Sequence, residues 1–104
     1  RRFMYYIYML RCEDNSIYTG ITTNVEHRME EHFSKVNCAK YTYSHTAKKL
    51  EGVWQTENRV LASKLEYRIK KLTKAQKEQL IVKNNLEELF NEKLECDKYK
   101  RLEI

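Results

Sequence analysis

The chain begins with two apolar runs that have the length and composition of β-strands. Phe3 to Leu10 is apolar or aromatic on both faces, which is typical of a strand covered on both sides, so we place it in the centre of a sheet. Ser16 to Thr22 predicts a second strand, and the polar residues 13–15 between the two runs predict a tight turn. The pattern therefore predicts an antiparallel hairpin.

The length of this turn decides which side chains share a face of the sheet. A two-residue loop would put Tyr8 and Tyr18 on opposite faces. A three-residue loop, with Asn15 in the left-handed region, would pair Tyr8 with Gly20 and put both tyrosines on one face. We expect the second register, or a bulge with the same effect, in which Gly20 leaves room above the sheet for the backbone of a ligand.

Later segments place apolar residues at helical spacing and follow residues that cap helices well. They are 25–33 after the polar residues 22–24, 59–72 after Asn58, and the segment after Thr73, whose capping-box partner is Gln76. Leu50 to Thr56 predicts a third strand. Residues 34–48 predict a loop with at most a short helical turn.

The predicted order is strand–strand–helix–strand–helix–helix, followed by a helical tail. This order is typical of an α+β domain with a small three-stranded antiparallel sheet flanked by helices. Residues 1–83 form the predicted domain, and residues 84–104 form a C-terminal helical extension that packs on the same domain or extends it. The helical spacing of an apolar stripe suits either a packed helix or a face for self-association or a protein partner, and its residues are Leu86, Leu89, Phe90 and Leu94.

Charge is divided unevenly between these two parts. Residues 1–83 contain 16 Lys and Arg against 9 Asp and Glu, whereas residues 84–104 contain 4 against 6. The basic part favours anionic partners such as nucleic acid. No apolar run approaches the roughly 18–20 residues of a membrane span, so we expect no membrane association. Three cysteines without metal-ligand spacing, and no export signal, favour a cytoplasmic protein.

Several motifs occur along this frame in a specific order. Tyr6-Ile7-Tyr8 lies on the first strand, Tyr18-Thr19-Gly20 on the second, Arg28 on the first helix and Glu66 on the long helix. Together they resemble the GIY-YIG nuclease superfamily over about residues 4–83, although the first motif lacks the initial Gly. The likeness is greatest to the short single-domain bacterial subgroup.

The resemblance implies a metal-dependent endonuclease. Its catalytic residues would be Tyr8, which activates water, Tyr18, which orients the water or the phosphate, and Arg28, with Glu66 as the ligand of one divalent metal, Mg²⁺ or Mn²⁺. Elementary chemistry agrees, because a guanidinium makes forked contacts to phosphate and a mostly hydrated Mg²⁺ needs few carboxylates. A phenol has a pKa of roughly 10, so Tyr8 needs a nearby cation to act as a base.

Two further assignments stay open at this point. His32 lies one turn after Arg28, and it is either a buried structural histidine or a proton relay or phosphate donor within the catalytic set. Many family members use an Asn after the Glu helix. Asn84 and Asn85 are the candidates here, and their spacing does not distinguish them.

A second group of residues is expected to contact nucleic acid, because aromatic rings stack on bases and lysines bind phosphates. These residues are Gly20, Lys40, Tyr41, Lys48, Lys70 and Lys71. A solvated loop and a solvated helix face are the alternatives.

The leading hypothesis is an endonuclease that cuts branched or single-stranded DNA in repair or recombination, with RNA as an alternative substrate. One rival is a nucleic-acid-binding module of the same fold with weak or no catalytic activity. Another is a protein-interaction domain that uses the acidic tail. The nuclease hypothesis expects Tyr8, Tyr18, Arg28 and Glu66 to open onto one accessible groove.

Overall fold

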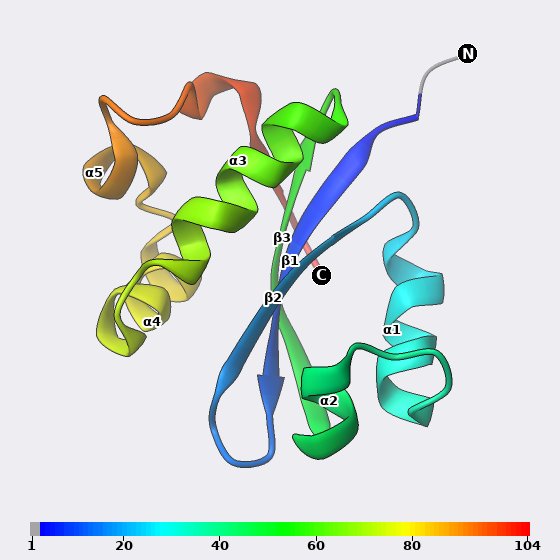
Figure 1. Ribbon diagram of the computed structural model, residues 1–104. Coiled ribbons are helices and arrows are strands. Elements are labelled where there is room, and N and C mark those ends of the chain that lie inside the picture. The colour runs from blue at the N-terminus through cyan, green and yellow to red at the C-terminus, as the bar shows by residue number, and fades with distance from the viewer. Residues whose placement is uncertain (1–2) are drawn as a thin grey trace.

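Strand β1 (Tyr5–Cys12) is the centre around which the other elements are arranged. In the computed structural model, which describes residues 3–104, four strands form one antiparallel sheet in the order β2-β1-β3-β4 (Figure 1). The other strands are β2 (Ile17–Thr22), β3 (Ala47–Thr56) and β4 (Lys100–Leu102). The expected central position of the first strand is therefore confirmed.

The hairpin turn has the three-residue form. Asn15 has φ of 74°, and its N–H donates to the Cys12 carbonyl at 2.9 Å. The Cys12 N–H donates to the Ser16 carbonyl at the same distance, which closes the turn. The resulting register pairs Tyr8 with Gly20 and Leu10 with Tyr18, as the sequence predicted.

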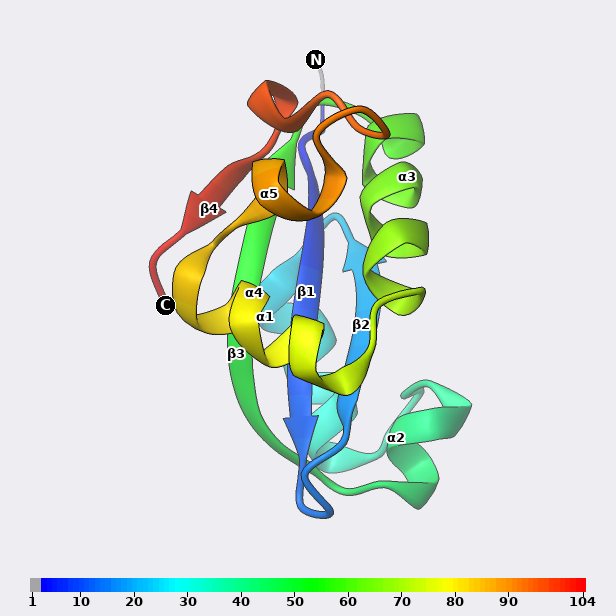
Figure 2. The same ribbon diagram turned by 90° about the vertical axis from the view of Figure 1, so that its left-hand side faces the viewer.

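Helices cover both faces of the sheet (Figure 2). One face holds α1 (Val25–Ser34), and α2 (Lys40–Ser44) lies at the lower end of the same side in Figure 1. The other face holds α3 (Arg59–Lys70), α4 (Lys74–Lys83) and α5 (Leu86–Phe90). The main apolar core lies beneath this second group of helices, around Trp54, Leu65 and Ile69.

Helix starts follow the capping chemistry predicted from sequence. Asn24 and Asn58 accept from the N–H groups of His27 and Leu61, and Thr73 forms a complete capping box with Gln76. The third strand begins at residue 47 rather than 50, and the long helix ends at 70 rather than 72. The segment predicted as a loop with a short helical turn contains α2.

The C-terminal segment differs from the helical extension that we expected. After α5 the chain forms only a short 3₁₀ helix, η1 (Cys96–Lys98), and then β4, which pairs with β3 and makes the sheet four-stranded rather than three-stranded. Periodicity did not reveal β4 because three residues are too few to show an alternation. The Arg101 guanidinium donates to the Ile81 carbonyl at 3.0 Å and lies 4.7 Å from the centre of the Trp54 ring.

The stripe predicted as a packed or self-associating face is part of the core. Leu86, Phe90 and Leu94 are buried together with Tyr99, whose hydroxyl donates to the Leu61 carbonyl at 2.6 Å. Because these side chains already contact the domain, they are not free to form an interface. Leu89, the remaining residue of the stripe, is partly buried against the same core.

An ion network fixes α4 to the turn end of the sheet. Arg11 donates to Glu78 at 2.7 and 2.9 Å, and also contacts Glu51 and Asn15. Hydrogen bonds from Arg11, and then from Lys74, lower the pKa of Glu78 to about 2. The network connects three elements that are distant in sequence.

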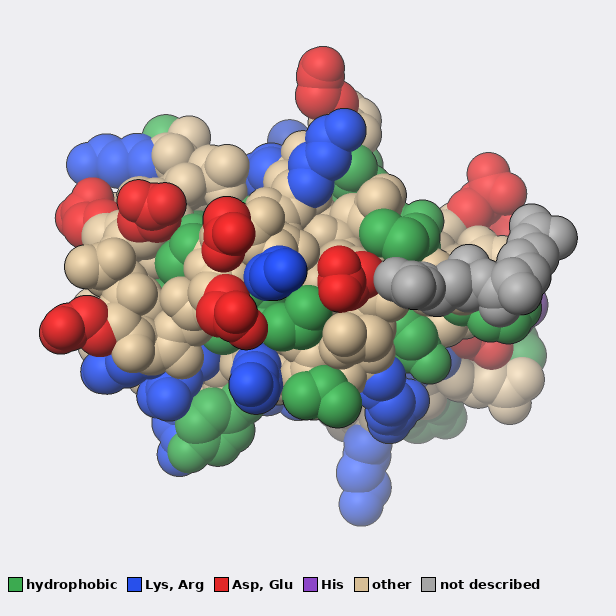
Figure 3. Space-filling model, turned by 90° about the horizontal axis from the view of Figure 1, so that it is seen from above, with side chains coloured by type: hydrophobic (Ala, Val, Ile, Leu, Met, Phe, Trp, Pro, Cys, Tyr) green, Lys and Arg blue, Asp and Glu red, His purple; other side chains and the backbone are tan. Residues whose placement is uncertain are grey.

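Charge is not evenly spread over the surface. In the view from above, acidic side chains stand over much of the face, and Lys and Arg side chains gather mainly along the edge on the α3 side (Figure 3). Within residues 3–104, no helix is both long and apolar enough to cross a membrane. The three cysteines are free thiols.

The docking of the C-terminal segment can be tested by deleting a core side chain. Phe90→Ala should lower the free energy of unfolding by about 3–5 kcal/mol, because it removes a buried ring. Val82→Ala is the control, since Val82 is exposed, and should change stability by less than about 0.5 kcal/mol. Urea denaturation measures both, and equal small losses would contradict the docking.

Candidate active site

The register of the hairpin brings the Tyr8 ring directly over Gly20. A Cβ atom at Gly20 would lie 2.5 Å from the Tyr8 hydroxyl oxygen and 2.7 Å from Cζ, so only glycine fits. We expected the space above Gly20 to admit the backbone of a ligand. Instead, the Tyr8 side chain fills it, which removes Gly20 from the nucleic-acid contacts.

Tyr8 begins a chain of polar contacts that ends at a backbone carbonyl. Its hydroxyl lies 2.7 Å from His32 Nε2, and His32 Nδ1 lies 2.7 Å from Thr42 Oγ1. The Thr42 hydroxyl donates to the Ala39 carbonyl at 3.2 Å. A hydroxyl has one proton to donate, so Thr42 accepts the proton of Nδ1. Neutral His32 therefore accepts at Nε2, and Tyr8 is the donor.

Burial keeps both ends of the Tyr8–His32 pair neutral. It raises the pKa of Tyr8 to about 12, although the neighbouring Arg28 opposes the rise by favouring the phenolate. It lowers the pKa of His32 to about 4, with a further lowering from the Arg28 charge. The resting state is a neutral phenol hydrogen-bonded to a neutral imidazole.

Tyr18 lies at the edge strand and is only half-buried, beside the same two rings. Its ring centre is 6.2 Å from that of Tyr8 and 5.4 Å from that of His32. The Tyr18 ring also stacks with the Tyr41 ring, with 5.7 Å between the ring centres. The Lys70 ammonium lies 5.9 Å from the centre of the Tyr18 ring. Tyr18 therefore joins the buried pair to the surface.

Arg28 is held on the α1 side of this group. Its Nη1 donates to Glu31 at 2.7 Å, one turn further along α1, and to the Asn37 carbonyl at 2.9 Å. These contacts fix the guanidinium close enough to Tyr8 and His32 to affect the pKa of both. The side chain is 23% exposed, so part of it faces solvent.

Glu66 approaches from the opposite side, on α3. Its carboxylate lies 3.3 Å from the Lys70 ammonium, and its charge contributes to the raised pKa of Tyr8. The α3 helix thus carries Glu66 to the edge of the sheet where Tyr18 stands. Tyr8 and Tyr18 lie on two strands, and Arg28 and Glu66 lie on two helices. Arg28, Tyr18 and Glu66 all lie close enough to Tyr8 to influence its pKa.

The donor set fits a hydrated Mg²⁺ ion. Residues 3–104 contain no group of three or more His, Cys, Asp or Glu side chains arranged to hold a metal. Mg²⁺ often uses one carboxylate, several waters and substrate oxygens, and Glu66 is a single carboxylate that is partly exposed. Its present partner, Lys70, forms an i,i+4 pair of the kind that contributes little to stability.

The solvent exposure of the four side chains differs from the single accessible groove that we expected. Tyr18, Arg28 and Glu66 are all partly exposed, but Tyr8 is only 1% exposed. The four side chains therefore do not all open onto one groove. Tyr8 lies beneath the others, because the absence of a side chain at Gly20 lets its ring pack down onto the sheet.

Of the residues expected to contact nucleic acid, Tyr41 and Lys70 lie beside Tyr18, and the other lysines lie apart from it. Lys40 and Lys48 are exposed on α2 and at the start of β3, and Tyr41 stacks between neighbours, at 4.0 Å from His45. Lys70 faces Glu66 and Tyr18. Lys71 instead lies 5.3 Å from the centre of the Tyr67 ring.

Two other groups near the site were not anticipated. Thr42 fixes the tautomer of His32, and His45, which is hydrogen-bonded to Asp14 at 2.7 Å, extends the aromatic stack. Neither follows from periodicity, because Thr42 lies in α2, a five-residue helix too short to show a helical pattern, and His45 follows directly after it. The alternation of aromatic and polar residues there was the available signal.

The late asparagines have structural contacts elsewhere. Asn84 ends α4 in the left-handed conformation and accepts from the Trp54 indole at 2.9 Å. Asn85 lines a hollow with Cys96 and Tyr99. Both therefore lie on the far face of the sheet from His32, and neither belongs to the group around Tyr8.

The sequence matches a known protein family over most of its length. The sequence profile of the GIY-YIG catalytic domain matches residues 4–79. The chain belongs to the GIY-YIG family. This domain is a nuclease fold, so membership implies a nucleic-acid substrate in general terms, and the resemblance stated from the motifs is confirmed.

Relatives within the GIY-YIG family are small proteins of similar length. A UPF0213 protein of Fusobacterium nucleatum is 51% identical over 79 residues, which are 76% of this chain and 78% of that protein. One of Clostridium perfringens is 43% identical over 90 residues, or 86% of this chain and 96% of that protein.

A solved structure also resembles the fold. The solution NMR structure of a UPF0213 protein from Bacillus halodurans has a TM-score of 0.50 and 36% identity. The match covers 88% of this chain and 97% of that chain. It supports the α+β architecture with an antiparallel sheet.

The close packing of Tyr8 on Gly20 can be tested by a double-mutant cycle. Gly20→Ala should lower the free energy of unfolding by about 1–3 kcal/mol, because its methyl group overlaps the Tyr8 hydroxyl. In the Tyr8→Ala background the same change should cost almost nothing, since the overlap is gone. Equal costs in both backgrounds, by urea denaturation, would show that the contact is not the cause.

The buried, neutral His32 should make stability depend on pH. Its folded pKa lies below the ordinary value of 6.5, so the unfolded chain binds a proton that the folded chain does not. Stability should therefore fall as pH drops from 6.5 towards 4, by up to about 1.4 kcal/mol per pH unit. The interval between pH 6.5 and 5 is informative, because it lies above the titration of the carboxylates.

Urea denaturation at pH 7 and pH 5 measures this dependence. His32→Gln should reduce the difference between the two pH values, whereas the matched variant His27→Gln, at an exposed position of the same helix, should retain it. An undiminished difference in His32→Gln would exclude His32 as the source.

Proposed function

We propose that this protein is a divalent-metal-dependent endonuclease that hydrolyses DNA phosphodiesters. The substrates that we infer are branched or single-stranded DNA, in repair or recombination, and the family match supports the nuclease activity in general. RNA remains a second candidate substrate of the same chemistry.

The observation that carries the proposal is the convergence of Tyr8, Tyr18, Arg28 and Glu66 from separate elements. Positive and negative groups meet at the edge of the sheet, with a phenol at the surface and another directly below. A structural role explains a buried Tyr8. It does not explain why a guanidinium and a carboxylate from opposite faces both lie close enough to influence that phenol.

Within this site, Tyr8 and His32 form a route for a proton. The Tyr8 hydroxyl donates to His32 Nε2, so loss of the Tyr8 proton to His32 leaves a phenolate that accepts a proton from the attacking water. The water oxygen forms the new bond to phosphorus, the bond from phosphorus to the leaving oxygen breaks, and that oxygen takes a proton from solvent. The proton of the attacking water ends on the Tyr8 oxygen, and the former Tyr8 proton ends on His32 Nε2. With a pKa of about 12 at one end and about 4 at the other, this transfer is unfavourable in the resting site.

Positive charge near the phenol is therefore a requirement of the mechanism. Arg28 already favours the phenolate, and its guanidinium is suited to two phosphate oxygens at once. When bound at Glu66, a divalent ion would supply further positive charge and neutralise the phosphoryl oxygens. Glu66 holds that position, and Lys70 is the group displaced from it.

A second candidate function has one observation in its favour. Because Tyr8 is 1% exposed, a substrate water reaches its hydroxyl only after the surrounding side chains move. A nucleic-acid-binding module with weak or no turnover needs no such movement. This candidate predicts salt-dependent binding without metal-dependent cleavage.

Cleavage assays on flaps, forks, junctions, single-stranded DNA and RNA, with and without Mg²⁺ or Mn²⁺, test the two candidates. Glu66→Ala and Arg28→Ala should abolish metal-dependent cleavage, and Tyr8→Phe should reduce it by about 10²–10⁴-fold, which is the usual contribution of general acid–base groups. Each variant is compared with wild type for product and for folding.

Matched controls are exposed residues of the same types: Glu30→Ala for the carboxylate and Tyr43→Phe for the phenol, both expected to retain activity. Full activity in a clean preparation of Glu66→Ala would exclude the single-carboxylate metal site. No cleavage by wild type on any substrate would leave the binding module as the better description.

A further inference from the structure

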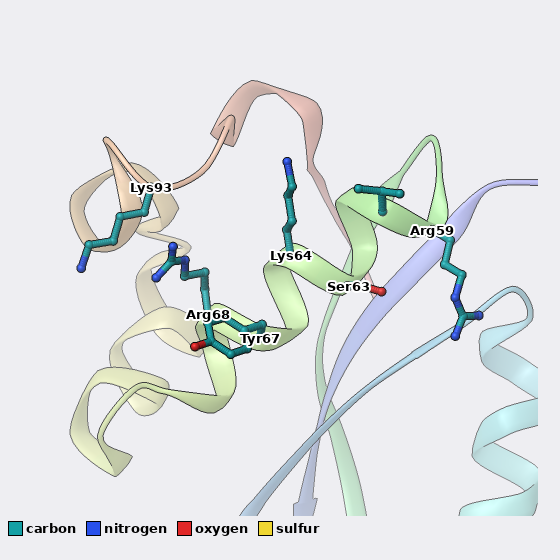
Figure 4. A pocket seen from close by; sticks show the side chains of 7 residues that line it. Arg59, Ser63, Lys64, Tyr67, Arg68 and Lys93 are labelled. Atoms are coloured by element: carbon teal, nitrogen blue, oxygen red, sulfur yellow. The ribbon is translucent and has the colours of Figure 1, made fainter.

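The outer face of α3, away from the sheet, carries an open hollow of about 600 Å³. Its lining is basic and aromatic, with α3 side chains joined by Lys93 from the segment after α5 (Figure 4). The residues used below are Lys64, Tyr67, Arg68 and Lys93.

The cations of this hollow have no acidic partner. Within residues 3–104, Lys64, Arg68 and Lys93 form no ion pair within 4.0 Å, whereas Arg11 and Arg28 are paired with carboxylates. Glu92 and Glu95 line a neighbouring hollow that Lys64 and Lys93 also border, so acidic side chains adjoin the basic surface on that side. Unpaired cations gathered in this way favour a polyanionic ligand.

An exposed aromatic ring lies among these cations. Tyr67 is 56% exposed, and the Arg68 guanidinium and the Lys71 ammonium lie 5.6 and 5.3 Å from its centre. Nothing in the core requires a ring at this position. A tyrosine flanked by cations is suited to stacking a base while the neighbouring cations bind its phosphates.

The helical repeat relates the hollow to the candidate active site around the circumference of α3. At 100° per residue, Glu66 and Lys70 lie on adjacent sides of the helix, Tyr67 follows beyond Lys70, and Arg68 lies further round. Lys70 contacts Glu66 and lies above Tyr18, which places it between the two regions. A strand that leaves the site at Glu66 can therefore cross α3 towards Tyr67.

We propose that the outer face of α3 binds an unpaired nucleic-acid strand that continues from the scissile phosphate. Tyr67 stacks with a base, and Lys64, Arg68 and Lys93 bind phosphates. The proposal rests on the proposed function for the identity of the ligand, and it adds a second contact region to the same substrate. This binding surface also accounts for the position of the Lys71 ammonium beside the Tyr67 ring.

Fluorescence anisotropy with a labelled oligothymidylate, in EDTA and over a range of NaCl concentrations, tests the proposal without catalysis. The double variant Lys64→Ala/Arg68→Ala should bind about tenfold more weakly. The slope of log K against log [salt] should become less steep by about 1.4, because two phosphate contacts at about 0.7 each are lost. The control double variant, Lys83→Ala/Lys100→Ala, removes the same charge from exposed positions elsewhere and should change affinity less than twofold.

The ring is tested separately. Tyr67→Ala should weaken binding by about tenfold, within the usual range for base stacking, whereas Tyr67→Phe keeps the ring and should bind as wild type. Equal losses in the two double variants would indicate bulk charge and overturn the proposal. Unchanged binding in Tyr67→Ala would also overturn the proposal, and so would no binding of the oligonucleotide by wild type. An acidic protein segment found bound to this surface in place of nucleic acid would overturn it as well.

Failure of this proposal is distinguishable from failure of the proposed function. If wild type binds the oligonucleotide with the predicted sensitivities but cleaves nothing, the α3 surface stands and the nuclease assignment falls. If wild type cleaves DNA in a Glu66-dependent way while binding is insensitive to substitution of Lys64, Tyr67 and Arg68, the nuclease assignment stands and the α3 surface falls. Urea denaturation of each variant excludes unfolding as the cause.

Discussion

The pairing of Tyr8 with Gly20 is the constraint on which the site depends. It follows from a turn in which Asn15 adopts the left-handed conformation, and it puts a residue with no side chain opposite a phenol. The ring packs into the space and its hydroxyl reaches His32 on the helix above. One residue more or less in the turn would reverse the face on which Tyr18 lies and separate the two tyrosines.

Packing on the two faces of the sheet serves different purposes. The face under α3, α4 and α5 holds the larger apolar core, which the C-terminal segment completes through Phe90, Tyr99 and Arg101. The opposite face is smaller and contains His32 and Thr42 as buried polar groups. Glu66 connects the two, because α3 packs on the first face while its carboxylate reaches the edge strand. The stability of the larger core therefore positions Glu66, a group of the candidate active site on the edge of the other face.

The hairpin register, the central strand and the helix caps could be predicted from sequence because each is decided by a few neighbouring residues. The partners of the site residues could not. Burial of Tyr8 depends on how closely α1 and Tyr18 cover it, and the role of Thr42 depends on the path of an irregular segment. β4 depends on a tertiary contact of Arg101 with Trp54 rather than on local pattern. Features set by neighbouring residues could be predicted from the sequence, and features set by tertiary contacts could not.

The Ala39 carbonyl, which accepts from Thr42, has a consequence for how the site tolerates change. It is a main-chain group, so no substitution at residue 39 short of a rearranged backbone removes it as an acceptor. As long as a hydroxyl stands at residue 42, the imidazole keeps the same tautomer and the phenol keeps pointing its hydrogen the same way. The direction of the hydrogen bonds from Tyr8 through His32 to Thr42 is thus set by a backbone group. Substitutions elsewhere around α2 leave that direction unchanged.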